Sequence, residues 1–426
     1  MARPTPEPFQ AATDCIRCGR CMSVCPIYGR TKNEWDSPRG KMSLVDAYTG
    51  DRKGLYSLLS RCLACGACET VCANQVPCVR KILAGREAQT KKTGTGWIAG
   101  TQVAALTDTG PGPELLRKGG RLFQALACRE VPGTSGLHLR FPLEFFSRHK
   151  IMPRLARRPF LYETPERIAP QGSPRARAAL FVGCGANHVF TSAATAFVQL
   201  ATASGAEVLV PRAQECCGLA DRVSGDREGA LRQAVRFLEV FGGLEAECIV
   251  TLCASCASQI VHLPLMFPKD SPKREKALDL ASRHVEASDF LLSLPSLSQR
   301  LREGATPVGG NRLKVHYHAP CHLRFGPATT TGPRDLLALL PGMELATDPD
   351  QVSCCGHGGS FNLRHQELSS GILEGCLANL EGLPLDAVVT GCTGCLVQLS
   401  EGLALGQEQG VEVVHYLEWV RKLAGL

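Results

Sequence analysis

The sequence predicts a mixed fold in which a helical N-terminal region is followed by two copies of one α/β unit. Two observations predict it. An arrangement of five cysteines occurs twice in the C-terminal half, at closely matched spacings: Cys184, Cys216, Cys217, Cys253 and Cys256, then Cys321, Cys354, Cys355, Cys392 and Cys395. Around both copies, β-branched runs alternate with amphipathic segments, which is typical of a parallel α/β fold.

The elements of the repeated unit follow from local patterns. Four apolar runs that end at a cysteine predict strands: 178–184, 246–253, 314–321 and 385–392. Two segments have the apolar spacing of helices: 227–241 and 364–380. Parallel α/β folds bind ligands at the carboxyl ends of their strands. We therefore expect the cysteines that follow these strands to face binding sites.

Two further cysteine runs occupy the N-terminal region: Cys15, Cys18, Cys21 and Cys25, then Cys62, Cys65, Cys68 and Cys72. Their spacing is that of bacterial two-cluster ferredoxins, in which the fourth cysteine of each run binds the other cluster. We expect two cubane 4Fe–4S clusters, one held by Cys15, Cys18, Cys21 and Cys72, the other by Cys62, Cys65, Cys68 and Cys25. Helical patterns at 40–48 and 53–63 favour a helical ferredoxin-like domain.

The cysteine content also indicates the cellular compartment in which the protein is expected to work. The chain has 22 cysteines among 426 residues, and Met1 to Thr13 is polar and Pro-rich, with no apolar segment of a secretory signal. We therefore expect a reducing, cytoplasmic compartment, where clustered cysteines bind metals or carry out redox chemistry instead of forming disulfides. No run of about 18 apolar residues exists, so no membrane-spanning helix is expected.

The ten repeated cysteines admit two interpretations. The plainer one is a pair of thioredoxin-like Cys-x-x-Cys motifs with incidental neighbours. Thioredoxin motifs are not preceded by a vicinal cysteine pair at a matched distance, whereas this sequence has that arrangement twice. Five thiolates from three loops can instead hold an iron–sulfur cluster of irregular geometry. We expect each copy to bind its own 4Fe–4S cluster, which makes four clusters in all.

Four cysteines lie outside these sets: Cys78, Cys128, Cys248 and Cys376. Cys248 and Cys376 lie in apolar strand or helix patterns and are expected to pack in the core. Cys78, six residues after Cys72, is a candidate for a replacement ligand. Four histidines near the repeated cysteines are expected to hydrogen bond to sulfurs or carbonyls, with proton transfer as the alternative: His316, His318, His322 and His357.

The formal charge of +7 is unevenly distributed. Between Pro111 and Arg177 there are 13 Lys and Arg against 5 Asp and Glu. No nucleic-acid-reading motif accompanies these basic residues, so nucleic-acid binding is not expected. Two readings stay open: a solvated connector, or a docking surface for an acidic partner or for anionic lipid headgroups.

The spacing of a cysteine, a Cys-Cys-Gly and a Cys-x-x-Cys resembles the cysteine-rich CCG domain. That domain occurs in heterodisulfide reductase subunits, where it carries non-cubane 4Fe–4S clusters, and in iron–sulfur subunits of 2-hydroxyacid dehydrogenases. Two ferredoxin motifs followed by two CCG domains resemble the iron–sulfur subunit of glycolate oxidase and D-lactate dehydrogenase. The segments 34–45 and 414–420 are also similar to that family. The resemblance implies non-cubane clusters in the two repeats.

Four regions are therefore predicted along the chain. They are a helical ferredoxin-like domain with two 4Fe–4S sites (1–95), a basic, Gly- and Pro-rich helical connector (96–177), a first CCG domain (178–305) and a second CCG domain (306–426).

The sequence lacks features of an enzyme that oxidises a hydroxyacid by itself. No dinucleotide fingerprint follows a predicted strand, no P-loop is present, and no segment resembles a flavin domain. The resemblance therefore implies an electron-transfer subunit without a catalytic residue of its own. Its implied partners are an FAD-containing dehydrogenase subunit as donor and a quinone or other membrane-bound acceptor. The implied location is cytoplasmic, either free or peripheral on the inner face of the cytoplasmic membrane.

Two other functions stay open. The pairs Cys253/Cys256 and Cys392/Cys395 are both complete. This resembles heterodisulfide reductase, and the resemblance implies a catalytic subunit that cleaves a disulfide at a CCG-bound cluster. A cluster-loaded scaffold or sensor is the third reading.

Overall fold

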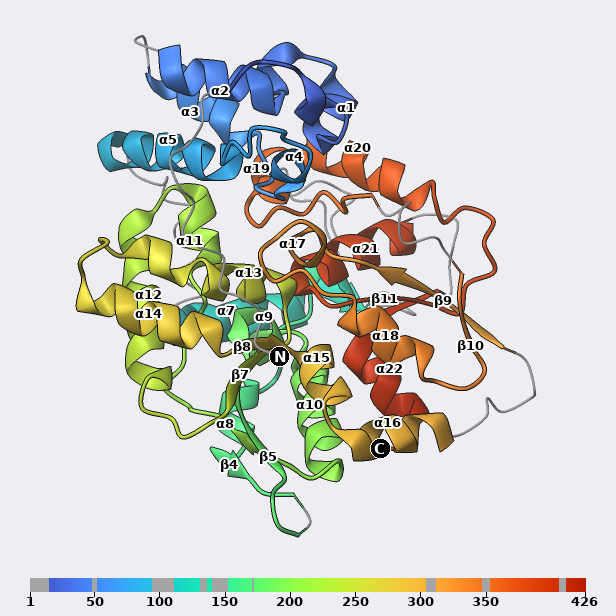
Figure 1. The fold of residues 1–426 in the computed structure, drawn as a ribbon. Helices are drawn as coiled ribbons and strands as arrows, with labels where there is room; N and C mark the ends of the chain where they lie inside the picture. The colour runs from blue at the N-terminus through green and yellow to red at the C-terminus, as the bar shows by residue number, and fades with distance from the viewer. Residues whose placement is uncertain are drawn as a thin grey trace.

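The computed structural model describes these residues: 15–47, 52–93, 111–130, 136–139, 152–170, 172–303, 312–346, 353–405 and 411–426. The fold is mixed α/β, as predicted, with an N-terminal helical domain and two α/β units that each contain a mainly parallel sheet. Figure 1 shows the N-terminal helices at the top, next to α19 and α20 of the second unit. The predictions about 1–13 and 96–110 lie outside the described residues.

The N-terminal domain consists of short helices that connect the cysteine runs. They are η1 (Arg20–Met22), α1 (Pro26–Thr31), η2 (Glu34–Asp36), α2 (Pro38–Ala47), α3 (Arg52–Ser60), α4 (Ala67–Thr70) and α5 (Cys78–Thr93). The two predicted helices are α2 and α3, and α5 packs on both. Their contact buries Met42, Leu59 and Ile82 almost completely. A core this small gains stability when bound metal ties its loops together.

The first α/β unit contains a five-stranded sheet of order β4-β6-β5-β7-β8. Its strands are β4 (Arg167–Ile168), β5 (Ala176–Phe181), β6 (Ala206–Leu209), β7 (Cys248–Thr251) and β8 (His284–Glu286). Only β4 is antiparallel to its neighbour. Its helices are α9 (Gly183–His188), α10 (Thr191–Ala203), α11 (Leu219–Ser224), α12 (Arg227–Phe241), α13 (Ala254–Val261), η3 (Leu263–Met266), α14 (Pro272–Ser282), α15 (Ala287–Leu292) and α16 (Pro295–Glu303). The predicted strands and helix of this copy are β5, β7 and α12.

The second α/β unit contains a parallel sheet of order β10-β9-β11-β12. Its strands are β9 (Leu313–His318), β10 (Met343–Leu345), β11 (Ala387–Thr390) and β12 (Glu412–His415). Its helices are α17 (Cys321–Arg324), α18 (Gly332–Ala338), α19 (Phe361–Arg364), α20 (Gln366–Leu377), α21 (Thr393–Leu405) and α22 (Tyr416–Leu423). In sheet order, β10, β9, β11 and β12 occupy the places that β6, β5, β7 and β8 occupy in the first unit. The repeat seen in the sequence is therefore also a repeat of topology.

The described part of the connector contains short strands as well as helices. It contains α7 (Pro111–Ala127) and α8 (Phe160–Glu163), but also an antiparallel sheet of β1 (Cys128–Glu130), β2 (Gly136–Leu139) and β3 (Met152–Pro153). Strands of two to four residues show no periodic pattern that sequence inspection could find. The edge strand β4 also comes from the connector, because it pairs with β6 of the first unit.

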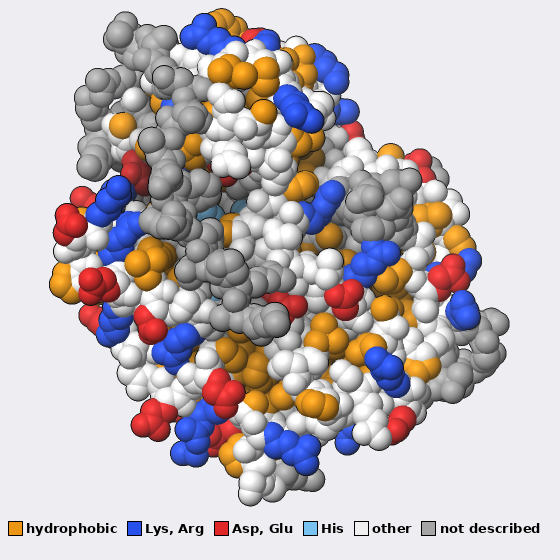
Figure 2. All heavy atoms as spheres, in the orientation of Figure 1, with side chains coloured by type: hydrophobic (Ala, Val, Ile, Leu, Met, Phe, Trp, Pro, Cys, Tyr) orange, Lys and Arg blue, Asp and Glu red, His pale blue; other side chains and the backbone are white. Residues whose placement is uncertain are grey.

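The two α/β units share one hydrophobic core. Helix α22 of the second unit packs on α10 of the first, and the buried cluster includes Phe197 and Tyr416. The Tyr416 hydroxyl donates to Glu286 Oε1 at 2.7 Å. Among the described helices, none is both long and apolar enough to cross a bilayer. Basic and acidic side chains are interspersed over the face drawn in Figure 2.

Candidate metal centres

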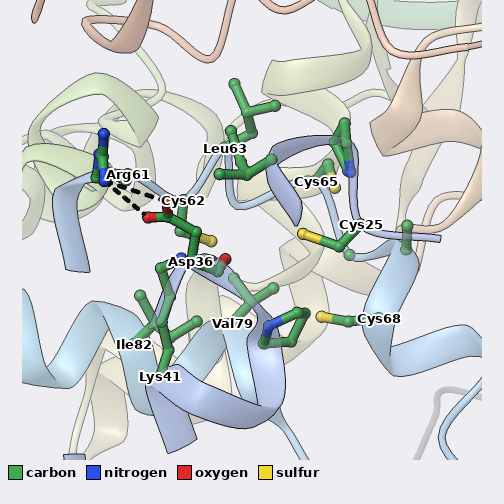
Figure 3. Close-up of a pocket in the computed structure, with 15 residues that line it drawn as sticks. Cys25, Asp36, Lys41, Arg61, Cys62, Leu63, Cys65, Cys68, Val79 and Ile82 are labelled. Carbon is green, nitrogen blue, oxygen red and sulfur yellow. Dashed lines mark hydrogen bonds and ion pairs between the residues drawn. The ribbon is translucent and has the colours of Figure 1, made fainter. Parts of the chain in front are cut away.

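A pocket in the N-terminal domain is lined by cysteines from both N-terminal runs: Cys25, Cys62, Cys65 and Cys68. Figure 3 shows these side chains around the pocket, together with the aliphatic side chains of Leu63, Val79 and Ile82, which also line it. Cys25 comes from the first run and the other three from the second. The structure therefore brings together the same four residues that the ferredoxin spacing assigns to one cluster, with the fourth cysteine of the first run joining three of the second.

Local backbone geometry positions these sulfurs. Cys25 is the N-cap of α1, Pro26 is the first helical residue, and the Tyr28 amide donates to the Cys25 sulfur at 3.5 Å. The Ala64 amide likewise donates to the Cys62 sulfur at 3.4 Å. Burial raises the pKa of Cys25, so its thiolate form needs a nearby cation.

The other predicted N-terminal group is more open. Cys15, Cys21 and Cys72 pack against one hydrophobic cluster, whereas Cys18 is exposed. Burial, and then the nearby Cys78, raise the pKa of Cys21 to about 11. The structure thus places three of the four predicted ligands against one core and the fourth at the surface.

A charged network beside the pocket was missed by sequence reasoning. Lys41 is only 2% exposed, and its ammonium group donates to the Asp36 carbonyl. Arg61 donates to both carboxylate oxygens of Asp36, at 3.1 and 3.2 Å (Figure 3). Lys41 lies close enough to Cys25 and Cys62 for their charges to interact. In the sequence this lysine is one basic residue within a helical pattern. Only its place in segment 34–45, which is similar to the family, could have indicated a role for it.

Replacing Lys41 with glutamine is expected to make the N-terminal site beside it harder to reduce. The substitution removes a buried positive charge near two candidate ligands, and a unit charge about 8 Å away at an effective dielectric constant of about 20 corresponds to roughly 90 mV for one electron. An EPR-monitored redox titration measures the shift. Arg30→Gln is the matched control, because the Arg30 side chain is 54% exposed and solvent screens its charge. Equal shifts in both variants would contradict the expectation.

In the first α/β unit, the five repeated cysteines lie at the carboxyl end of the sheet. Cys184 follows β5, and its sulfur is 3.7 Å from that of Cys216. Cys217 hydrogen bonds to Cys256, which also hydrogen bonds to Cys253 after β7. All five side chains therefore join one group of contacting sulfurs.

The second α/β unit repeats this arrangement. Cys321 hydrogen bonds to Cys354, the sulfurs of Cys355 and Cys395 are 3.3 Å apart, and Cys392 hydrogen bonds to Cys395. Each Cys-Cys pair is followed by a glycine with a left-handed backbone: Gly218 with φ 83° and Gly356 with φ 84°. Glycine adopts this conformation without a steric cost, which explains its place in both motifs.

The two groups of five meet each other and the N-terminal domain. The sulfurs of Cys253 and Cys392 are 3.9 Å apart. Cys354 shares a hydrophobic cluster with Cys65 of the N-terminal pocket, and Cys65 also interacts electrostatically with Cys321. We call this continuous series the sulfur row. It runs from the N-terminal pocket through the second unit to the first, an order that the sequence does not reveal.

The chemistry of the sulfur row fits bound iron–sulfur clusters. Hydrogen bonds from Cys216 and Cys256 lower the pKa of Cys217 to about 6, whereas the bond to Cys217 raises the pKa of Cys256. Thiols this close cannot all ionise unless a cation compensates their charge. All 22 cysteines lie in described residues, and none forms a disulfide. Thiolate sulfur is the donor that iron–sulfur clusters prefer.

His322 connects three parts of the molecule. Its Nε2 donates to the Ala64 carbonyl at 3.3 Å, and its Nδ1 accepts from the Ser255 hydroxyl at 3.2 Å. Ser255 Oγ is in turn 3.4 Å from the Cys392 sulfur. This contact with a carbonyl agrees with the expectation for the histidines near the repeated cysteines.

The four cysteines outside the motifs are all buried or half-buried. Cys128 and Cys376 are buried, and Cys248 is half-buried against the core of the first unit. Cys78 begins α5 and hydrogen bonds to Cys68, so it lies directly beside the N-terminal pocket.

Comparison with known proteins agrees with this geometry. Residues 11–76 match the model of the 4Fe-4S dicluster domain, and 178–261 and 315–400 both match the model of the cysteine-rich (CCG) domain. The chain therefore belongs to the iron–sulfur proteins in which one dicluster domain precedes two cysteine-rich domains.

Individual relatives match the chain over different shares of its length. The chain is 26% identical over 423 residues to a probable glycolate oxidase iron-sulfur subunit of Bacillus subtilis, covering 97% of this chain and 94% of that protein. It is 27% identical to lactate utilization protein A of Oceanobacillus iheyensis over 57% of this chain and 95% of that protein. An uncharacterized iron-sulfur protein of Methanocaldococcus jannaschii is 23% identical over 93% of this chain and 69% of its own length.

Proposed function

We propose that this chain is the iron–sulfur electron-transfer subunit of a 2-hydroxyacid dehydrogenase that acts on glycolate or D-lactate. An FAD-containing subunit oxidises the hydroxyacid, and a quinone or another membrane-bound carrier accepts the electrons. Similarity over nearly the full length to a probable glycolate oxidase iron-sulfur subunit supports the proposal. The observation that carries it is the sulfur row, because it joins the cluster sites into one series.

The proposed ligands are the eighteen motif cysteines in the groups given above. The N-terminal runs would hold two cubane 4Fe–4S clusters, and each repeat would hold one further 4Fe–4S cluster of non-cubane form. Clusters of this kind accept and release single electrons when bound. The chain's own residues hold the clusters close together and exclude water, since the cysteines of both repeats are mostly buried. Short spacing within a dry interior is what rapid electron transfer needs.

Purification with the neighbouring flavoprotein tests this function. The complex is expected to reduce an artificial dye when glycolate or D-lactate is added, and the chain alone is expected to be inactive. Absence of a copurifying flavoprotein together with inactivity toward every 2-hydroxyacid would contradict the proposal. Dye reduction driven by a dithiol would instead favour the heterodisulfide reductase-like function.

A surface on the connector supports a peripheral membrane location. Five apolar side chains of α7 are exposed: Leu115, Leu116, Leu122, Phe123 and Leu126. The polar side of the same helix faces the protein, because Gln124 donates to the Pro153 carbonyl at 3.0 Å and Arg121 donates to the Arg157 carbonyl at 2.6 Å. An amphipathic helix with its apolar side outward is suited to the interface of a bilayer.

Positive charge next to this helix favours a membrane that contains anionic lipids. Arg154, Arg157 and Arg158 are exposed on the segment that α7 contacts, and Lys118 is exposed on α7 itself. We propose that α7 and these basic residues bind anionic lipids. This is the docking interpretation of the basic connector, with lipid as the partner.

Vesicle flotation tests the lipid surface. The complex is expected to float with vesicles that contain phosphatidylglycerol and to bind phosphatidylcholine vesicles more weakly. Leu122→Ser with Leu126→Ser should reduce binding at least tenfold, because each exposed leucine contributes about 1.5 kcal/mol or more when it enters the bilayer. Leu278→Ser with Leu363→Ser is the control, since both leucines are exposed on other helices, α14 and α19. Unchanged binding by the α7 variant would contradict the proposal.

A further inference from the structure

The two repeats differ at one buried position next to their cysteines. The last residue of β5 is Phe181 and the last residue of β9 is His318. Each is paired with a threonine that ends the neighbouring strand, Thr251 in the first repeat and Thr390 in the second. The two positions are therefore equivalent, and only the second repeat places a nitrogen donor there.

In the first repeat this position is filled by apolar packing. Phe181 contacts Phe237 and Phe241, with ring centroids 5.5 and 5.7 Å apart. In the second repeat His318 has no exposed surface, and its Nδ1 is 3.8 Å from the sulfur of Cys376 on α20. A phenylalanine cluster is thus replaced by a pair of polar side chains within an otherwise apolar region.

One nitrogen of His318 has no partner within the described residues. Its Nε2 is buried and makes no hydrogen bond. An unpaired buried polar atom costs about 1–3 kcal/mol, so its presence calls for a partner that the protein atoms do not supply. The nearby sulfurs of Cys355 and Cys395, two candidate cluster ligands of the second repeat, show where such a partner would bind.

The donor atoms around His318 have the spacing of metal ligands. One ring nitrogen of His318 and the sulfurs of Cys355 and Cys395 all lie within 4.8 Å of one another. Two ligands at ordinary metal–nitrogen and metal–sulfur distances of about 2.0–2.3 Å from one ion are at most about 4.6 Å apart. A single iron can therefore reach all three atoms with little movement of the side chains.

Cys376 can set the protonation of the ring. Its thiol donates to the Ser353 carbonyl, with sulfur and oxygen 3.8 Å apart. With its single proton used there, the sulfur accepts from His318 Nδ1–H. Nε2 is then left with a free lone pair, which is the form of histidine that binds metals.

We propose that Nε2 of His318 is an iron ligand in the second repeat, together with Cys355 and Cys395. The inference rests on the proposed presence of a cluster in that repeat. It makes the two repeat sites chemically different, because the equivalent position in the first repeat is the apolar Phe181. A neutral nitrogen ligand makes a cluster easier to reduce than thiolates alone, as in clusters with histidine ligands.

Pulsed EPR on the reduced holoprotein with ¹⁵N-labelled histidine tests this ligand. We expect a strong hyperfine coupling to one histidine nitrogen on the cluster signal of the second repeat. His318→Phe, which installs the residue that the first repeat has, should abolish the coupling and shift the midpoint potential of that signal to a lower value. His316→Phe on the same strand is the matched control and should leave the coupling in place.

Measuring the iron content of the wild type shows whether a negative result contradicts only the histidine ligand or also the proposed function. A normal iron content without strong nitrogen coupling in the wild type would overturn the histidine ligand alone. Absence of a cluster from the second repeat would overturn both. The wild-type measurement decides the question even if His318→Phe fails to fold.

Discussion

Replacing Cys354 and Cys355 together with serine is expected to remove about four irons from the protein, and the pair Cys216 and Cys217 is expected to behave in the same way. Each vicinal pair lies at the centre of a group of five contacting sulfurs, so its loss leaves only three of the five cysteines to hold a 4Fe–4S cluster. Iron and sulfide analysis measures the loss, starting from about sixteen irons for four such clusters.

The matched control for both double variants is Cys248→Ser. Cys248 is a half-buried cysteine at the start of β7, in the same unit but outside the motif. It should retain all iron, and the EPR signals of the N-terminal clusters should persist in every variant. If the Cys216/Cys217 variant keeps its full iron content, the first repeat has a purely structural role.

Replacing Cys25 with alanine is expected to remove the same EPR signal as replacing Cys65, although the two residues belong to different runs. The physical reason is the pocket, which Cys25 lines together with three cysteines of the second run. Loss of one ligand from a site this small should release up to four irons. Iron analysis and EPR of each single variant measure the effect.

Cys21→Ala provides the comparison within the first run. Cys21 lies outside the pocket formed by Cys25, so its replacement should affect the other N-terminal signal. If Cys25→Ala and Cys21→Ala remove the same signal, the crossed grouping is wrong.

Much of the fold follows from local sequence patterns. The strands before Cys184, Cys253, Cys321 and Cys392 are predicted because buried parallel strands are short, β-branched and continuous in hydrophobicity. The helix 227–241 is predicted to its ends from its apolar spacing, and in the structure an aspartate N-cap and a following glycine delimit it. The helix predicted at 364–380 is split into α19 and α20 and ends at Leu377.

Features that depend on packing between distant segments could not be predicted. The 3.9 Å approach of Cys253 to Cys392 results from the shared core of the two units, which no local pattern encodes. The burial of Lys41 against Asp36 depends in the same way on how α2 packs. His318 is part of an apolar strand pattern, and its unpaired Nε2 becomes visible only when its surroundings are known.

The most direct test concerns the position of the second unit in the sulfur row, between the N-terminal pocket and the first unit. The complex of this chain with its flavoprotein is mixed anaerobically with glycolate or D-lactate, frozen after increasing times and examined by EPR. In the wild type, signals of the N-terminal sites and of both repeats are expected to appear. In the Cys354→Ser, Cys355→Ser variant, only the sites on one side of the missing cluster should be reduced rapidly. Rapid reduction of all remaining sites in this variant would contradict the account.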